Sequence, residues 1–597
     1  MKRILIIIAI AAAAAVACNK EVTERPSTDG IRTLSLSAEL PDTKVNADKG
    51  KITWSAGDAV AVYNTNGTKF TLTLSDGAGT NYGKFSGSFS GTLATDIAVY
   101  PASLASDTKG VVSIPKFMER SDSVQPVMAS ALEVNGSEVN ALCFHHVMAM
   151  VEVTLKDLPA FACALKLFSK TGAQLNGDYT INSGLNGVNC DTGNSEAGTN
   201  DRVLFFPYKT AYGSDASVKF YFPVAPYEYT DLKIRVLDGD ESIIEGTDLA
   251  IKQASSNLKA GDYLTLPTVN VRAQLGSSRD QFIKVEGVKW AKGNLRAWRS
   301  GTPGEGWQEG WNIYDNQWES QYMLTAAEID VNSKGFSLNT DQYKETIGDA
   351  SVYTHWDYFS WGTLSRTSRV HNAPVTCTTA EFDITGKVFY LEGGKGDIST
   401  AQELSGDSRW EDVGTFQTTN STLVGDLAFW ASKGQYRMPD KSEIGSLYAK
   451  NNVGKGCNHA NMQAGYYIVD GKVLRGILFT SCPSWSTTEY YTEAVELSDA
   501  DMESGLFLPK IGERTTNSDP VEYNATVVNF FNAWGVYWSG TYGGRNSGFE
   551  DCARHINFTS GNVMTYGYTS KLSKTITGQT VLGNAIRPVW IPENERQ

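Results

Sequence analysis

The sequence predicts a mainly β protein, with two β-sandwich domains followed by an α+β domain. The first observation is the distribution of tryptophan, because only Trp54 precedes Trp290 and the other thirteen lie between Trp290 and Trp590. The second is the scarcity of helical periodicity before residue 272, where β-rich runs alternate with turn signals at short intervals. We therefore expect two architectures that join near residue 275.

The chain begins with a segment typical of exported lipoproteins. Lys2 and Arg3 precede an apolar run over residues 4–16, and Ala17 stands directly before Cys18. This run is too short for a permanent membrane span and fits a cleaved signal peptide. The segment resembles a bacterial lipoprotein signal, which implies cleavage before Cys18 and a fatty acyl chain such as palmitate on its thiol. The alternative is an ordinary cleaved signal in which Cys18 has no role.

Length and composition limit the function and the domain count. The net charge is −14 and no basic cluster could neutralise phosphates, so we expect no nucleic-acid partner. Seven cysteines follow Cys18, and this sparse, odd set does not predict a disulfide framework. At 597 residues the chain exceeds what one core supports. We expect a signal peptide at 1–17, a flexible leader at 18–32, sandwiches at 33–142 and 143–272, a linker at 273–280 and a last domain at 281–597.

The first half contains a clear hairpin pattern. Residues 58–63 and 68–74 are predicted to be strands, and the turn between them contains Asn66 and Gly67, which we expect to supply positive φ values. Further strands are predicted over residues 147–155, 218–224 and 232–237.

Four motifs of this half resemble the fimbrillin-like lipoproteins of Bacteroides-type bacteria. They are ITWSAGDAVAVY at 52–63, FHHVMAMVEV at 144–153, YFPVAP at 221–226 and LKAGDY at 258–263. The resemblance covers about residues 30 to 272. It implies two transthyretin-like β-sandwiches and assembly into pili with other pilin subunits by donor-strand exchange.

The same resemblance implies proteolytic processing. In this family an arginine-specific protease cuts near the first strand and releases it, so that a strand of another subunit can replace it. Arg25 and Arg32 are the only arginines between Cys18 and Arg120. Arg32 is the better candidate because it precedes the strand-like residues 33–38; alternatively, both arginines are ordinary solvated residues of the leader.

The second half mixes one clear helix with strands. Asp440 and Glu443 have the spacing of a capping box, and Ile444 and Leu447 follow at helical spacing. Strands are predicted at 282–288, 476–480, 506–509, 535–539 and 555–558.

Six stretches of this half resemble bacterial domains that share the C-type-lectin-like fold with formylglycine-generating enzymes and recur in Fibrobacter surface proteins. They are WAKGNL at 290–295, YFSWG at 358–362, RMP at 437–439 with Glu443, LFLP at 506–509, GVYWS at 535–539 and AIRPV at 585–589. The resemblance implies an α+β lectin-like domain but does not give its function, because such folds carry several chemistries.

Candidate sites for catalysis and metal binding are weak. Cys552 lies where the formylglycine-generating enzymes carry a reactive cysteine, but Cys482 could reach it only through the fold. Cys457 with His459, and Cys552 with His555, are too far apart in sequence for a typical zinc site. We therefore expect a protein that is not an enzyme and that holds no metal or cofactor.

Two acidic stretches were considered as calcium loops. Residues 238–241 and 498–503 are rich in carboxylates but lack the ligand pattern of a dedicated loop. The triplets that bind calcium and sugar in animal lectins are absent from the chain.

Aromatic residues give the remaining functional signal. Two clusters surround Gly-rich stretches, and exposed aromatic rings offer flat apolar faces to sugars or protein partners. The residues that we expect to bind a ligand are Trp307, Trp311, Trp318, Tyr542 and Arg545. The alternative is that the fold buries many of these rings.

Together these patterns predict a lipid-anchored, surface-exposed protein of the cell outer membrane, with a role in a fimbrium. A C-terminal domain of over 300 residues should obstruct strand donation, which favours a pilus tip and adhesion to a glycan or protein. The alternatives are a monomeric outer-membrane glycan-binding lipoprotein and an enzyme related to the formylglycine generators.

Overall fold

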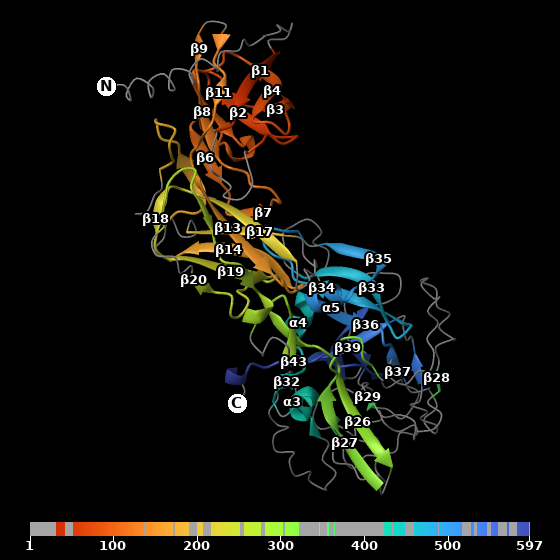
Figure 1. Ribbon diagram of the computed structural model, residues 1–597. Helices are drawn as coiled ribbons and strands as arrows, with labels where there is room; N and C mark the ends of the chain where they lie inside the picture. Colours follow the sequence, from red (N-terminus) through yellow and green to blue (C-terminus); the bar gives the residue numbers. More distant parts are fainter. Residues whose placement is uncertain are drawn as a thin grey trace.

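The computed structural model contains three successive β-rich parts (Figure 1). The mainly β fold class predicted from the sequence is confirmed. The structure describes residues 31–41, 52–135, 138–170, 173–189, 200–206, 216–250, 256–275, 281–302, 305–320, 345–346, 355–356, 363–364, 423–424, 426–432, 434–447, 459–487, 489–515, 527–529, 534–545, 551–558, 570–571 and 582–595.

The first domain is one eight-stranded sheet that closes around a core. In hydrogen-bonded order its strands are β11 (Leu142–Cys143), β1 (Ile31–Glu39), β4 (Tyr82–Ser90), β3 (Lys69–Asp76), β2 (Ala59–Tyr63), β5 (Asp96–Tyr100), β8 (Met128–Leu132) and β12 (His145–His146). The outermost strands β11 and β12 are neighbours in sequence, so one short segment lines both edges. The sheet therefore ends at His146, four residues beyond the expected boundary at 142.

A buried tryptophan organises the core of this sheet. Trp54 packs edge to face against three other rings, with centroids 4.8 Å from Phe85, 5.2 Å from Tyr100 and 5.8 Å from Phe144. Edge-to-face pairs of this kind stabilise beyond the apolar area that they bury.

The predicted hairpin forms between β2 and β3, but its turn differs from the expectation. Gly67 has a positive φ of 82°, whereas Asn66 is not among the residues with positive φ. Instead, the Asn64 side-chain oxygen accepts the N–H groups of Asn66 and Thr68. A side chain that satisfies the turn in this way replaces the second positive φ.

The second domain is a two-layer sandwich. One layer has the order β17 (Ser217–Val224), β13 (Ala149–Lys156), β22 (Tyr263–Thr265), with β23 (Val269–Asn270) also beside β13; the other has the order β20 (Leu249–Ala250), β19 (Leu232–Asp238), β14 (Ala162–Ser169), β16 (Asp201–Phe205), β7 (Phe117–Glu119). Its apolar core lies between β13 and β17 on one side and β14 and β19 on the other. The predicted strands at 147–155, 218–224 and 232–237 correspond to β13, β17 and β19.

The two domains share a core of their own. Val99 and Ala129 of the first sheet pack with Val112 and Ile114 of β6 (Val111–Ile114) and with Tyr179 of the second domain. β6 pairs with β15 (Gly177–Thr180), and β7 pairs with β16, so the chain crosses into the second domain before the first is complete. This exchange of strands joins the two domains firmly.

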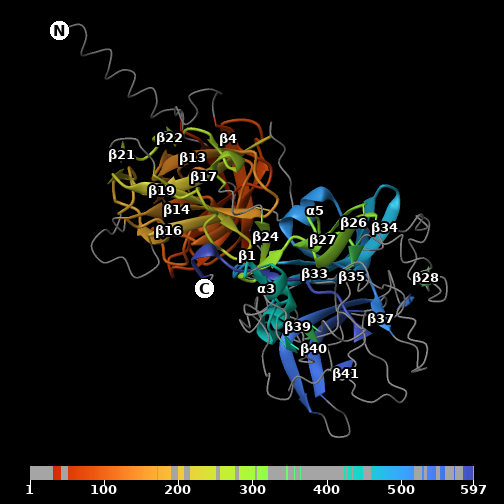
Figure 2. The ribbon, with the colours of Figure 1, turned by 90° about the horizontal axis from the view of Figure 1, so that it is seen from below.

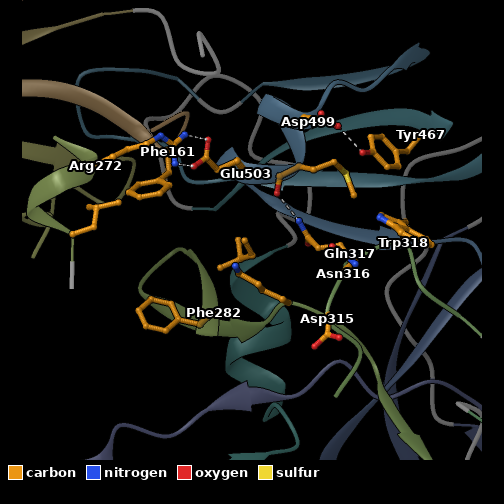
Figure 3. A pocket seen from close by; sticks show the side chains of 14 residues that line it. Phe161, Arg272, Phe282, Asp315, Asn316, Gln317, Trp318, Tyr467, Asp499 and Glu503 are labelled. Atoms are coloured by element: carbon orange, nitrogen blue, oxygen red, sulfur yellow. Dashed lines mark hydrogen bonds and ion pairs between the residues drawn. The ribbon is translucent and has the colours of Figure 1, made fainter. Parts of the chain in front are cut away.

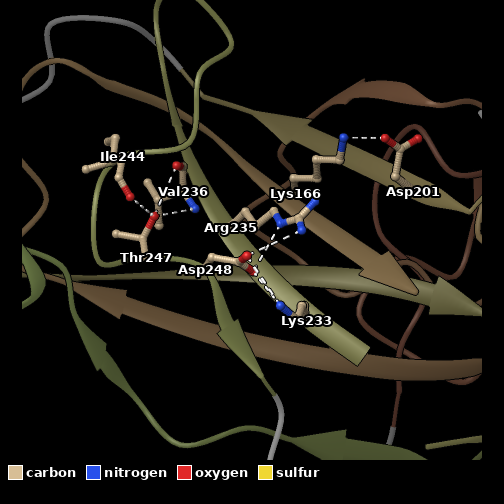
Figure 4. A network of polar contacts seen from close by, with 8 residues as sticks. All are labelled: Lys166, Asp201, Lys233, Arg235, Val236, Ile244, Thr247 and Asp248. Carbon is tan, nitrogen blue, oxygen red and sulfur yellow. Dashed lines mark hydrogen bonds and ion pairs between the residues drawn. The ribbon is translucent and has the colours of Figure 1, made fainter. Parts of the chain in front are cut away.

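The outer face of the second layer carries a network of ion pairs (Figure 4). Asp248 accepts from Arg235 at 3.1 Å and from Lys233 at 3.3 Å, and Asp201 pairs with Lys166. The Arg235 and Lys233 contacts hold the pKa of Asp248 below its usual range. Thr247 fixes the turn before β20 by donating to Ile244 O at 2.7 Å.

The third part contains several small sheets and short helices. Its main strands are β24 (Phe282–Val285), β25 (Val288–Ala291), β26 (Leu295–Thr302), β27 (Glu305–Ile313), β32 (Tyr436–Arg437), β33 (Asn461–Val469), β34 (Lys472–Thr480), β35 (Tyr490–Glu496), β36 (Leu506–Pro509), β39 (Gly535–Arg545), β40 (Asp551–Phe558) and β43 (Val589–Trp590), and its helices are α3 (Leu427–Ala431), α4 (Lys441–Ser446) and α5 (Asp499–Ser504). β24 lies where this part meets the sandwiches (Figure 2). The first strands pair with the last, because β25 and β32 flank β43.

Local predictions for this part succeed with one exception. The capping box of α4 is present, because Asp440 accepts from the backbone of Glu443 and the Glu443 side chain accepts from the backbone of Asp440. The expected strand over 282–288 is instead a hairpin, since Glu286 and Gly287 take positive φ values and separate β24 from β25.

A buried arginine ties the ends of the third part together. Arg587 Nε donates to Asn294 Oδ1 at 2.8 Å, and its other nitrogens donate to the carbonyls of Lys292 at 3.2 Å and Gln317 at 3.1 Å. Burial lowers the pKa of Arg587 to about 10. Asn294 and Arg587 belong to two of the motifs that carry the lectin-like resemblance, and both have a structural role here.

Within the described part of the chain, no helix has the length and apolar character needed to cross a membrane.

Replacing Asn294 with Ala should weaken the third part strongly, because the buried Arg587 Nε then loses its acceptor. We expect a loss of about 2 kcal/mol in unfolding free energy. Asn312→Ala is the matched control, because Asn312 accepts from Arg296 Nε in the same way at the exposed surface. Thermal unfolding followed by tryptophan fluorescence measures both variants; equal losses would contradict the assigned role of Asn294.

Candidate functional site

A pocket of about 310 Å³ lies between the second sandwich and the third part of the chain (Figure 3). Trp318 and Tyr467 stand on one side of it, and Phe161 and Phe282 stand on the other. Its size is at the lower end of pockets that bind small molecules. The sandwich contributes Phe161, Arg272 and Leu275, so the third part alone does not form the pocket.

The segment that carries Asn316 and Trp318 is fixed by the residue between them. The amide of Gln317 is buried, and its nitrogen donates to the carbonyls of Met502 at 2.7 Å and Gly505 at 2.9 Å. Its oxygen accepts from Phe507 N at 2.6 Å. The hydrogen bonds of this amide therefore reach α5, β36 and Gly505 between them, which makes the floor of the pocket rigid.

Glu503 of α5 docks the third part on the sandwich at one end of the pocket. Its carboxylate binds both terminal nitrogens of Arg272, at 2.7 and 2.8 Å, and accepts from Ala160 N at 3.1 Å. Asp157 holds Arg272 Nε at 3.3 Å. This two-pronged carboxylate–guanidinium geometry gives orientation as well as affinity.

The acidic stretch at 238–241 makes a second docking contact. Lys284 of β24 lies 3.2 Å from Asp238 and 3.4 Å from Asp240, and Glu241 accepts from Ser484 N at 2.5 Å. The stretch at 498–503 is α5 itself, which Ser498 and Asp501 cap. Both acidic stretches thus form contacts between the second sandwich and the third part.

An aromatic contact completes this interface. Trp485 stacks on Phe205 with centroids 5.7 Å apart and planes at 13°, and it lies 5.4 Å from Phe117. Nearby, Glu286 accepts from Cys482 N at 2.8 Å, and burial raises the pKa of Glu286 to about 7. The outer face of the second sandwich is therefore the surface on which the third part rests.

The polar side chains of the pocket fall into two groups. Arg272, Glu503 and Gln317 are engaged in the contacts above, and Tyr467 donates to Asp499 at 2.6 Å. In contrast, the side chains of Lys292, Asp315 and Asn316 have no hydrogen bond or ion pair with any other residue that the structure describes. These three residues line the same pocket as Trp318.

The structure places one of the five predicted ligand-binding side chains in this pocket. Trp318 lines it, half-buried. Trp307 and Trp311 belong to β27, and Tyr542 and Arg545 to β39, but their side chains lie outside what the structure describes. Ligand binding by the other four residues therefore remains a prediction.

Sequence reasoning missed most of the pocket. The sequence pattern places Arg272 at the end of a domain and indicates no function for Asn316 and Gln317. No local pattern would have revealed Gln317, because its partners lie about 190 residues further along the chain. The sequence marks Glu503 only as part of the acidic stretch at 498–503 and gives no partner for its carboxylate.

One of the two predicted processing sites, Arg32, lies in the first strand. Arg32 is the second residue of β1, where it pairs with Phe89 and donates to Gly91 O at 3.1 Å. A cut after Arg32 would therefore leave residues 33–39 in the sheet rather than release the strand. Arg25 and the predicted lipid site Cys18 lie outside the described residues.

The cysteine and histidine candidates do not assemble into a site in the described residues. Cys482 is disulfide-bonded, and His555 is buried beside Trp538 with its pKa lowered to about 4 by burial. Cys457 and the Cys552 side chain are not described. No cluster of three or more potential metal ligands occurs within the described ranges.

Comparisons with known proteins give remote structural neighbours only. No family model and no curated protein matches the chain. A proposed cell adhesion protein from Bacteroides ovatus shares 15% identity, with 40% of this chain and 92% of that protein covered and a TM-score of 0.26. One from Parabacteroides distasonis shares 11%, with 39% and 93% covered and a TM-score of 0.18.

The tip fimbrial protein Mfa3 from Porphyromonas gingivalis, truncated at its C-terminus, is a third neighbour. It shares 11% identity, with 47% of this chain and 99% of that protein covered and a TM-score of 0.19. Scores this low do not establish a shared fold, so the architecture rests on the strand pairing given above.

Replacing Glu503 with Ala should loosen the third part from the sandwich, because Arg272 and Ala160 both lose their acceptor. We expect amide hydrogen exchange around residues 157–161 and 499–504 to rise roughly tenfold. Glu489→Ala is the control, since Glu489 accepts from the exposed Tyr491 hydroxyl. Unchanged exchange in the Glu503 variant would show that the carboxylate does not hold the interface.

Proposed function

We propose that this chain is a cell-surface adhesin that binds a glycan in the pocket between its second sandwich and its third part. The lipoprotein-type signal supports export to the surface of the outer membrane, with the lipid on Cys18 as anchor. The observation that carries the ligand proposal is that Lys292, Asp315 and Asn316 line the same pocket as the half-buried Trp318, and their side chains have no polar partner among the described residues.

A sugar suits this set of groups. Hydroxyl groups both donate and accept hydrogen bonds, so one sugar ring can satisfy a cation, a carboxylate and an amide together. The apolar face of a pyranose can stack on an indole, which offers a flat surface with few rotatable bonds. The rigid floor formed by Gln317 reduces the entropy cost of binding.

We further propose that the adhesin occupies the tip of a fimbrium and associates there with other pilin subunits. The support is the pairing of strand β43. β43 pairs with both β25 and β32, and Trp590 stacks on Phe282 with centroids 5.0 Å apart. A strand held in this way is not free to complete the sheet of another subunit.

Two alternative functions make different demands on the structure. A monomeric outer-membrane glycan-binding lipoprotein would use the same pocket without entering a fimbrium. An enzyme of the formylglycine-generating type would need a free thiol pair, and one of the two candidate cysteines, Cys482, is already in a disulfide. We therefore favour a binding protein over an enzyme.

Binding to a glycan array should depend on Trp318. In the full-length protein, Trp318→Ala should lower affinity about tenfold, because it removes a stacking contact worth roughly 1.5 kcal/mol. Tyr491→Ala, an exposed ring on β35 away from the pocket, should bind like the unmodified protein. Equal binding by all three proteins would place the ligand elsewhere, and no binding by any would reject a glycan ligand.

Immunogold labelling of cells that produce the chain should mark the ends of surface fibres. Because β43 is paired within its own part and is not free to be donated, the proposal places the chain at the end of a fibre. Label along whole fibres would contradict a terminal position. Label on the cell body alone would favour the monomeric lipoprotein.

A further inference from the structure

A fully buried arginine of the second sandwich has no acidic partner. Arg202 belongs to β16 and is 2% exposed. Successive side chains of a strand point to opposite faces, so Asp201 meets Lys116 and Lys166 outside while Arg202 points inward. None of the residues that the structure describes forms an ion pair with Arg202.

The bonds that Arg202 makes are few and weak for a charged group. One terminal nitrogen donates to Pro223 O at 3.3 Å, and the other lies 3.3 Å from the Met118 sulfur. Its Nε is buried without an acceptor in the described structure. An isolated buried charge is strongly unfavourable unless a counter-charge is present.

Arg202 also lines a cavity of about 30 Å³. Ser121, Ser123, Gln125 and Tyr221 supply polar groups to its walls, and Leu104 closes it from the first domain. A single water molecule needs about 10–15 Å³ on this measure, so the cavity has room for water or for a small anion.

We propose that Arg202 binds a chloride ion in this cavity. The ion would supply the missing counter-charge, and the hydroxyl and amide groups of the walls would donate to it. Because the walls come from the crossing segment 121–125 and from Leu104, the bound ion would stabilise the junction of the first two domains. Burial lowers the pKa of Arg202 to about 10, in agreement with the absence of a nearby described carboxylate partner.

One carboxylate competes with this assignment. Glu119 also lines the cavity, although its side chain is exposed and forms no ion pair with Arg202. If Glu119 turned inward, it would neutralise the arginine without chloride. The alternative occupant of the cavity is a single water molecule.

Thermal unfolding of the full chain tests the proposal at constant ionic strength, with chloride exchanged for gluconate, a bulky organic anion. We expect the unfolding temperature to rise with chloride, by roughly 3–5 °C per tenfold increase above the dissociation constant. Arg202→Met should abolish this dependence, whereas Arg235→Met, which removes a surface ion pair, should retain it. Equal unfolding temperatures in chloride and gluconate would overturn the proposal.

Two further measurements cover the competing cases. A crystal of the unmodified protein grown with bromide should show anomalous scattering beside Arg202, even if the Arg202 variant fails to fold; a water molecule there instead would reject the ion site. Glu119→Gln should leave the chloride dependence intact. A large loss of stability in Glu119→Gln together with no response to chloride would assign the counter-charge to Glu119.

Discussion

The third part depends on one chain of buried polar contacts that begins at Arg587. This guanidinium joins the loop after β25 to the carbonyl of Gln317, and the Gln317 amide in turn holds α5 and β36. The last residue but one of α5 is Glu503, which binds Arg272 of the sandwich. Because each group in this series is satisfied only if its neighbours are in place, the C-terminal end of the chain positions the pocket and the domain interface together.

Local patterns in the sequence predicted local structure well. The capping box of α4 forms between two residues only three apart, Asp440 and Glu443. Runs of apolar and β-branched residues predict the strands β13, β17 and β19. The positive φ expected at Asn66 and the unbroken strand expected across Glu286 were wrong, because both places depend on side-chain hydrogen bonds and on neighbouring strands. The conformations of these two turns depend on residues outside the few that form each turn.

The site was less accessible from the sequence, because its residues come from segments far apart. Trp318 was found by its aromatic character, but Gln317 and Asn316 beside it resemble any polar loop. The acidic stretches were recognised as unusual without a role, since the basic partners Lys284 and Arg272 lie in other elements. The role of Trp485 could not be predicted from the sequence, because its partner rings, Phe117 of β7 and Phe205 of β16, lie far away in the chain.

The pairing of β43 with β25 means that the third part starts and finishes at neighbouring points. Under the proposed role, a ligand pulling on the pocket would not stretch this part from end to end. The tension would instead pass sideways through Trp485, Lys284 and Glu503 into the face of the sandwich. Many contacts would then share the load at once, which is a stronger arrangement than one in which they open one after another.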